Sequence, residues 1–261
     1  MEKIMVILHK EWLEITQQRG LVLGILLMPL FFTLLPIGVV YLVGHIPSSS
    51  SLNVGTIPLN PAFKGLTKEE SIQALLGAQF SIFYLLLPTL MTSIIASYSI
   101  VGEKTSRTLE PLLATPVRTW ELLTAKCLAS LIPAVVATWL SGALFIAAMA
   151  VFATSGRVFT AIVGPGWLVI FLLWTPLLGV ISVAAMVAIS SRVNDPRTAQ
   201  QLSAWAVVPF MGMFFSQLGG LQVLGPIFTL SVAVVLVPLA ILSVWGASRI
   251  FQREVILTRW K

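Results

Sequence analysis

The feature that most constrains the fold is a series of six long stretches without a single charged side chain. None of them contains Asp, Glu, Lys, Arg or His, and they lie at about residues 20–44, 74–100, 127–153, 165–190, 200–218 and 226–248. An α-helix needs about 20 apolar residues to cross the hydrocarbon core of a bilayer. The pattern therefore predicts an all-α integral membrane protein, a bundle of six transmembrane helices.

The composition agrees with this class and argues against a soluble enzyme. The chain is 57% hydrophobic and 10% charged, whereas soluble domains carry about 25% charged residues. Its single cysteine, Cys127, excludes an intramolecular disulfide framework, and its only histidines, His9 and His45, lie far apart in the sequence. We therefore predict no catalytic residue and no metal site in this chain.

The distribution of positive charge predicts the orientation of the bundle. Of the 16 Lys and Arg residues, only Lys64, Lys68 and Arg157 lie in the connections that follow the first and third stretches. The connection between the fifth and sixth stretches contains none. All the others lie in segments 1–19, 101–126, 191–199 and 249–261. Because cytoplasmic loops are rich in Lys and Arg, both termini are expected in the cytoplasm, which requires an even number of spans.

Residues 1–19 have the period of an amphipathic helix. At 100° per residue one side holds Ile4, Met5, Leu8, Trp12, Leu13 and Ile15. The other side holds Lys3, Lys10, Glu11, Glu14, Gln17 and Gln18, with Ile7 as the misfit. Such a helix before a span is expected to lie in the membrane interface; the alternative is a solvated cytoplasmic extension. The mixed charges and the lack of a cleavage site indicate that the first apolar segment is retained.

Two connections on the predicted outer side differ in character. Residues 45–73 are rich in Pro and Ser and then turn polar, so they are expected to form a loop with a short amphipathic piece, too polar to cross. Residues 219–226 are rich in glycine and fit either a tight outer turn or a re-entrant dip.

The absence of titratable groups at membrane depth argues against a proton relay, since such relays need them. If the protein is a transporter, its energy is expected to come from another subunit. Most of the hydroxyls and amides in the spans are expected to form hydrogen bonds between helices. A minority could line a route for an amphiphilic substrate, and the candidates are Gln79, Tyr84, Thr92, Ser97 and Gln217.

The longest predicted inside loop, residues 101–126, contains residues that are typical of helix N-termini. Thr108 can cap a short helix that runs to about Ala114, and Thr115 can cap a second one with Pro116 at its first position. The apolar contacts of the first helix would be Leu109, Leu112 and Leu113, and its charged rim Glu103, Lys104, Arg107 and Glu110. This arrangement suits a contact with a cytosolic partner; the alternative is a connector that rests on the lipid surface.

The run from Glu103 to Pro116, EKTSRTLEPLLATP, resembles the signature of ABC-2 type permeases, the membrane subunits of a class of ATP-binding-cassette transporters. The family pattern is E-[KR]-x-x-G-T-L-E-x-L-L-x-[ST]-P, and this sequence departs from it at Arg107, where glycine is commoner. Residues 190–202 are similar to the family's second inside loop, and residues 10–15 resemble its N-terminal elbow helix. The matches follow the family's order and cover nearly the whole chain.

The resemblance implies a single transmembrane domain over 1–261, with an elbow helix at 1–19, six spans within 20–248 and a cytoplasmic tail at 249–261. It implies a prokaryotic inner-membrane permease, mostly found as an exporter, that pairs with a second permease subunit in a dimer. A cytosolic ATPase subunit would bind ATP and Mg²⁺, so no cofactor is expected in this chain. The ATPase would contact residues 191–199 and a coupling helix formed by Glu103, Lys104, Arg107, Thr108, Leu109, Glu110, Leu112, Leu113, Thr115 and Pro116.

One alternative function stays open at this point. A membrane anchor or assembly factor that does not transport could use the same ATPase, because a coupling loop needs only a partner that changes shape. An intramembrane enzyme is disfavoured, since the sequence shows no polar or metal-binding cluster at membrane depth. The transported substrate cannot be read from the residues.

Overall fold

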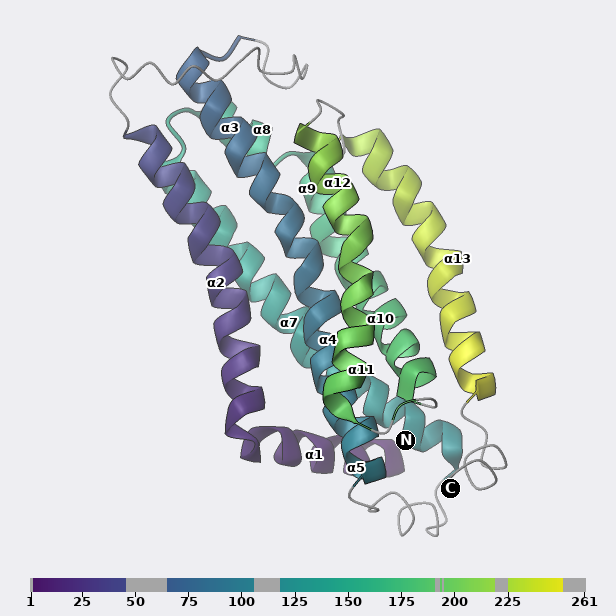
Figure 1. Ribbon diagram of the computed structural model, residues 1–261. Coiled ribbons are helices and arrows are strands. Elements are labelled where there is room, and N and C mark those ends of the chain that lie inside the picture. Colours follow the sequence, from purple (N-terminus) through teal and green to yellow (C-terminus); the bar gives the residue numbers. More distant parts are fainter. Residues whose placement is uncertain are drawn as a thin grey trace.

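The apolar stretches form long helices that run side by side along one axis (Figure 1). The computed structural model describes residues 2–45, 65–105, 118–190, 193, 195–218 and 225–250, and every regular element in these ranges is helical. Three of the long helices are continuous: α2 (Arg19–Gly44), α7 (Thr119–Phe152) and α13 (Pro226–Ile250). The expectation of an all-helical chain is confirmed for this part of the sequence.

The other long helices contain irregular turns, and three of these turns have a proline as their cause. A proline in a helix lacks an N–H group and clashes with the carbonyl four residues earlier. Pro88, Pro176 and Pro209 place that carbonyl on a residue of an irregular turn in each case. The turns are the 3-10 segments η2 (Ile82–Leu85) and η5 (Ala204–Val207) and the π segment η4 (Ile170–Trp174).

A fourth irregular turn, the π segment η3 (Ser97–Val101), is not followed by a proline in the next turn. It lies between α4 (Leu86–Ala96) and the short helix α5 (Gly102–Thr105). Single π turns within α-helices are frequent at functional sites. No proline accounts for this turn, in contrast to the other three.

The helix made of α3 (Lys68–Ser81), η2, α4 and η3 is the centre of the bundle. In its most apolar 18-residue window 78% of the residues are buried, against 17% in α2 and in α13. It packs against α2, α7 and α10 (Thr175–Ser190), while α13 packs against α10 at the edge (Figure 1). The exposed leucines and valines of α2 and α13 therefore lie on the outer surface of the bundle, as expected of helices in contact with lipid.

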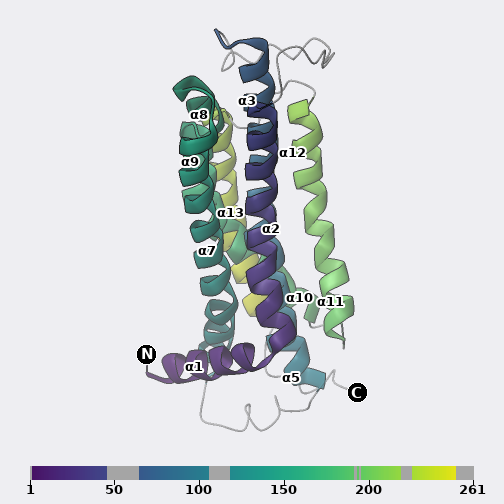
Figure 2. The ribbon, with the colours of Figure 1, turned by 90° about the vertical axis from the view of Figure 1, so that its left-hand side faces the viewer.

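Five helices are long and apolar enough to cross a membrane: Arg19–Gly44, Lys68–Val101, Trp120–Phe152, Pro165–Ser190 and Pro226–Arg249. The fifth predicted span, residues 200–218, is not among them. It is helical as α11 (Pro196–Ser203), η5 and α12 (Val208–Leu218), which run the length of the bundle beside α4 (Figures 1 and 2). Its glutamines and serines make it less apolar than the other five.

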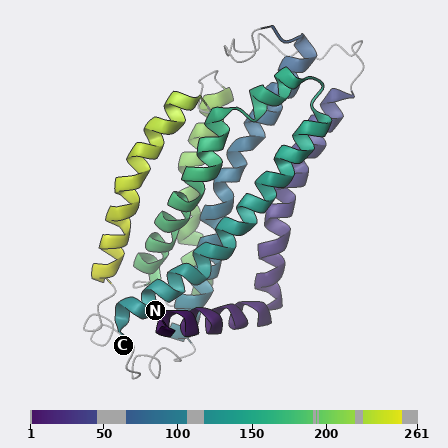
Figure 3. The ribbon, with the colours of Figure 1, turned by 180° about the vertical axis from the view of Figure 1, so that it is seen from behind.

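The two ends of the bundle are built differently. At one end, here the α1 end, helix α1 (Glu2–Gln17) lies across the bundle rather than along it, and only Gln18 separates it from α2 (Figures 2 and 3). At the other end, here the α8 end, the short helices α8 (Gly156–Ile162) and α9 (Pro165–Val169) return the chain from α7 into the bundle. The start of α3 lies beside α8.

A single glutamine joins three helices at the α8 end. Gln73 is buried in α3, and its Nε2 donates to the carbonyl oxygens of Val40 in α2, at 3.0 Å, and Phe152 in α7, at 3.3 Å. Its Oε1 accepts from the backbone N–H of Thr154 at 3.2 Å and from the Thr154 hydroxyl at 2.7 Å. We call this set of contacts the Gln73 junction. The polar piece predicted within the 45–73 loop thus includes the first turns of a long helix.

Candidate functional site

The predicted coupling residues fall in two groups. Glu103 and Lys104 lie in α5, which ends the second long helix. The others are in segment 106–117, outside the described residues: Arg107, Thr108, Leu109, Glu110, Leu112, Leu113, Thr115 and Pro116. Their assignment as a coupling helix stays a prediction. Glu103 lies in the helix that leads into this segment, and its contacts are part of the described structure.

Glu103 is part of a buried group of charged side chains at the α1 end. Lys126 in α7 places its Nζ atom 2.6 Å from Oε1 of Glu11 in α1 and 2.7 Å from Oε2 of Glu103. All three side chains are at least nine-tenths buried. One ammonium group thus joins carboxylates from two other helices, and three segments far apart in the sequence meet at Lys126.

Ser99, in the π turn η3, completes this group. Its hydroxyl donates to Oε2 of Glu11 at 2.6 Å. Its carbonyl and hydroxyl oxygens lie 3.1 Å and 3.2 Å from Nζ of Lys126. We call Glu11, Ser99, Glu103 and Lys126 the ionic cluster. The irregular turn that has no proline therefore carries a residue that contacts both members of the central ion pair.

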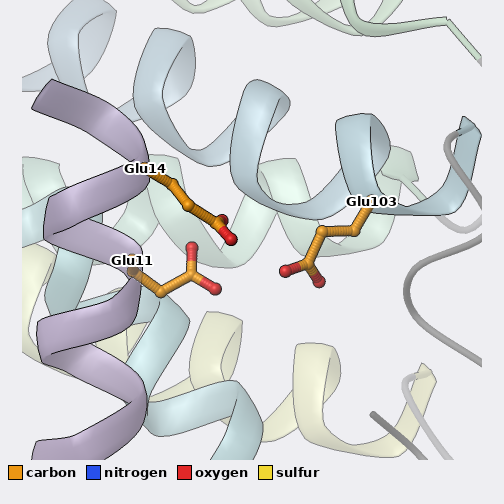
Figure 4. A group of neighbouring side chains, drawn as sticks. All are labelled: Glu11, Glu14 and Glu103. Atoms are coloured by element: carbon orange, nitrogen blue, oxygen red, sulfur yellow. The ribbon is translucent and has the colours of Figure 1, made fainter. Parts of the chain in front are cut away.

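Two half-exposed residues of α1 form the rim of the ionic cluster. Lys10 Nζ lies 2.7 Å from Oε1 of Glu103, 3.1 Å from Glu14 and 3.8 Å from Glu11. Figure 4 shows Glu11 and Glu14 on α1 facing Glu103 across the group. Since Lys10 and Lys126 both contact Glu103, its carboxylate is paired through each of its two oxygens.

A cation site is the other arrangement that three neighbouring carboxylates allow. The carboxylate oxygens of Glu11, Glu14 and Glu103 lie within 4.8 Å of one another, and hard cations prefer such oxygens. Two ammonium groups, however, already lie among these oxygens at ion-pair distances. A metal ion would have to displace them, so the geometry fits an ion-pair network better than a metal site.

The charges shift the pKa values of the groups they meet. Burial raises the pKa of Glu103, but the charge of Lys126 and the hydrogen bonds from Lys10 and Lys126 outweigh burial, and the net pKa lies below its ordinary value. Burial lowers the pKa of Lys10, but the hydrogen bond to Glu103 and the surrounding carboxylates shift it upward overall. Both groups are therefore held in their charged forms at neutral pH.

The structure corrects the predicted orientation of α1. The helical wheel placed Glu11 on the polar side, away from the apolar face, and left Ile7 as a misfit. In the structure Ile4, Ile7, Leu8, Glu11 and Ile15 share the side that packs toward the bundle, while Met5, Val6, Trp12 and Leu13 are exposed. A charged residue can occupy the packed side because Lys126 and Ser99 neutralise and hydrogen-bond it.

The structure also corrects the predicted environment of Glu103. The sequence analysis placed this carboxylate on the charged rim of a helix that faces a partner, whereas the structure buries it against α1 and α7. Sequence reasoning missed Glu11, Ser99 and Lys126 as parts of one site. The available signals were the misfit of Ile7 and the position of Lys126 directly before an uncharged stretch.

The five residues predicted to line a substrate route are all buried. Two of them bond within their own helix: the Thr92 hydroxyl donates to the Pro88 carbonyl at 2.6 Å, and the Ser97 hydroxyl donates to the Ile94 carbonyl at 2.8 Å. The role of these two residues in a route stays a prediction.

The other three route candidates keep polar atoms without a partner among the described residues. Gln79 Nε2 donates to the Phe214 carbonyl at 2.8 Å, but Oε1 of Gln79, the Tyr84 hydroxyl and Oε1 of Gln217 have no hydrogen bond there. The Tyr84 ring lies in an apolar cluster with Phe145 and Trp167, at 5.3 Å and 6.2 Å between ring centroids. Their role in a route stays a prediction.

The second predicted contact segment, residues 191–199, adjoins the ionic cluster. Residues 191, 192 and 194 are outside the described residues, and Asp195 caps α11 by accepting from the Thr198 N–H at 2.9 Å. This bond holds the pKa of Asp195 below its ordinary value. Ala199 packs with Ile100 and Val101 of η3, so α11 rests on the same irregular turn that carries Ser99.

A comparison with known protein families gives one match. The family model described as ABC-2 family transporter protein matches residues 5–233, most of the chain. The matched region contains all members of the ionic cluster, the Gln73 junction and both predicted contact segments. No curated protein matches the chain significantly.

Proposed function

The chain belongs to the ABC-2 family of transporter proteins and is a multi-pass membrane protein, and from this premise we propose that it is the permease subunit of an exporter driven by a separate ATPase. The observation that carries the proposal is the family match over residues 5–233. The absence of charged residues from the six apolar stretches supports an external source of energy, because proton-driven carriers need titratable groups at membrane depth.

The ATPase subunit would act at the α1 end of the bundle. At that end lie Glu103 and Lys126, which flank segment 106–117, the part of the sequence that resembles the coupling region of the family. The start of α11, which holds residues 196–199 of the second predicted contact segment, lies there too. The concentration of Lys and Arg in segments 1–19, 101–126, 191–199 and 249–261 supports a cytoplasmic position for this end. We expect two copies of the chain to pair, each with one ATPase subunit.

The proposal includes six spans and an N-terminal helix in the membrane interface. Helices α11 and α12, with η5 between them, would form the fifth span, because they run the length of the bundle in the described structure (Figure 2). The exposed side of α1, with Met5, Val6, Trp12 and Leu13, would rest in the lipid headgroup region.

Binding and ATPase measurements test the proposal. The chain is purified with and without a cognate ATP-binding-cassette subunit, and ATP hydrolysis is expected only in the complex, with binding weakened in Leu109→Ala and Glu110→Ala. The matched control is Glu70→Ala at the α8 end, which is expected to bind as the wild type does. A complex that is unchanged by both loop substitutions would refute the residue assignment.

The number of spans is tested by cysteine labelling. In a Cys127→Ser background, Arg197→Cys and Ser248→Cys flank α12 and α13, and both native side chains are exposed. With six spans a membrane-impermeant maleimide reaches both positions from the same side, and Arg157→Cys from the opposite side. Labelling of 197 and 248 from opposite sides would show that α12 does not cross.

A further inference from the structure

The ionic cluster lies where three chain segments meet around the connection between α5 and α7. Glu103 is two residues before the end of α5, and Lys126 is in the second turn of α7, so the two residues flank segment 106–117 on either side. Their ion pair, at 2.7 Å, ties the two described ends of this connection to each other. The same Lys126 is paired with Glu11, which ties both ends to α1.

From α1 the link continues directly into the bundle. Only Gln18 separates α1 from α2, and the backbone N–H groups of Leu21 and Val22 bond to the Gln18 carbonyl. Helix α2 in turn packs against α3 and α7. A displacement of Glu103 and Lys126 relative to the bundle would therefore reach α2 through α1, provided that the ionic cluster holds.

Charged residues suit such a link better than apolar ones would. A buried ion pair loses its hydration, and well-packed apolar side chains of similar volume often stabilise a fold equally well. What the ion pairs add is a defined geometry, because each donor has to meet its own acceptor. Here the Lys126 ammonium has acceptors on α1, η3 and α5, so only one placement of these helices satisfies it.

The π turn η3 supports the same interpretation. The other three irregular turns each contain the residue four positions before a proline, and η3 has no such proline. It presents both oxygens of Ser99 to Lys126 and the Ser99 hydroxyl to Glu11. The turn thus directs a residue of the central helix into the ionic cluster.

We propose that Glu11, Glu103 and Lys126 are positioning residues that join α1 to both ends of the connection between α5 and α7, so that a force applied to this connection by the ATPase subunit moves α1 and α2 together with it. The inference rests on the proposed function for the source of the force. The link itself is a property of this chain alone, and the two parts are tested separately.

The first experiment tests the link in the purified chain without a partner. Hydrogen exchange is measured by mass spectrometry for wild type, Glu103→Gln, Glu11→Gln and the control Glu14→Gln, whose side chain lies on the exposed rim. Glu103→Gln and Glu11→Gln are each expected to speed exchange in both α1 and residues 119–126, by roughly tenfold or more, as for the loss of a charge-assisted hydrogen bond. Unchanged exchange in both variants would overturn the inference.

The second experiment tests the transmission in the complex with the ATPase subunit, reconstituted in lipid nanodiscs. Because the Glu103 carboxylate is buried, Glu103→Gln is expected to bind the subunit with wild-type affinity but to lower its stimulated ATPase kcat by about tenfold or more, a loss that corresponds to about one charge-assisted hydrogen bond. Lys126→Arg, which keeps the charge, is expected to retain most of the stimulation, and Glu14→Gln all of it.

The outcomes distinguish the inference from the function on which it rests. Faster exchange together with wild-type stimulation would make the ionic cluster purely structural and would overturn the inference. A wild-type chain that neither binds nor stimulates the ATPase subunit would overturn the proposed function, and the wild-type arm alone reveals this. The inference is supported if Glu103→Gln binds the ATPase subunit as the wild type does but lowers its stimulated kcat, while Lys126→Arg retains most of the stimulation.

Discussion

At each end of the bundle a buried polar side chain joins three helices, but the two ends use different kinds of contact. At the α8 end the Gln73 junction joins α2, α3 and α7 through a neutral amide that bonds mainly to backbone groups. At the α1 end the ionic cluster joins α1, α5 and α7 through ion pairs between side chains. A neutral amide bonded to backbone loses little by burial, whereas buried ions are costly unless each is paired. The difference indicates that paired charges specify the position of the helices in the ionic cluster, whereas hydrogen bonds to backbone groups do so in the Gln73 junction.

The largest difference between the two ends is expected on removal of Lys126. Lys126→Met keeps an apolar stem of similar length but leaves Glu11 and Glu103 buried without their shared ammonium group. Breaking a buried ion pair from one side costs about 3–5 kcal/mol. The free energy of unfolding in detergent, from denaturant titration, is expected to fall by that amount. A loss below about 1 kcal/mol, the range of exposed pairs, would show that the cluster is solvated.

A smaller loss is expected at the α8 end. Gln73→Leu fills a similar volume but removes the hydrogen bonds to Val40, Phe152 and Thr154. The unpaired groups are backbone and hydroxyl groups at helix ends, so we expect a loss of about 2 kcal/mol. The same titration measures it, with Gln73→Glu as the variant of similar shape. A loss larger than that of Lys126→Met would reverse the comparison.

Only the stability contribution of the ionic cluster is expected to depend on pH. The folded-state pKa of Glu103 lies below its ordinary value of 4.5, so its contribution to stability is complete above 4.5 and is lost as the pH falls through the folded value. The charged groups that face it are Lys10, Glu11 and Glu14 from α1 and Lys126 from α7. The difference in unfolding free energy between wild type and Glu103→Gln is therefore expected to be constant near neutral pH and to shrink below 4.5. The Gln73→Leu difference should not change in this way, since an amide does not titrate.

The smallest change in stability is expected when the whole charge group is replaced. With Leu at positions 11, 103 and 126 no buried charge is left unpaired, and such apolar replacements are often neutral or stabilising. We expect an unfolding free energy within about 1 kcal/mol of wild type, together with the loss of ATPase stimulation in the complex. A stable triple variant that still stimulates the ATPase would show that packing, not charge, makes the link.

The sequence predicted the helical class and the long helices because their signal is local. About 20 uncharged residues in a row have few alternatives to a spanning helix. The resemblance at 103–116 also pointed to the right family, which the match over 5–233 confirms. The prolines were visible too, and three of them account for irregular turns that the structure shows. The six-span count and the coupling role of Leu109 and its neighbours remain predictions.

The tertiary structure decided which charged residues are buried and with which partners. The sequence predicts that Glu11 lies in an N-terminal helix and shows Lys126 directly before the third apolar stretch, but the two residues are 115 positions apart. Whether a carboxylate faces water or an ammonium group depends on how α1 crosses the bundle, which helical periodicity does not encode. Ile7, the misfit of the helical wheel, packs with Glu11 on one side because the bundle, rather than water, meets α1 there. Local hydropathy therefore determined that the chain forms membrane helices, while long-range electrostatic pairing, which only the fold brings about, determined how the helices at the α1 end are held together.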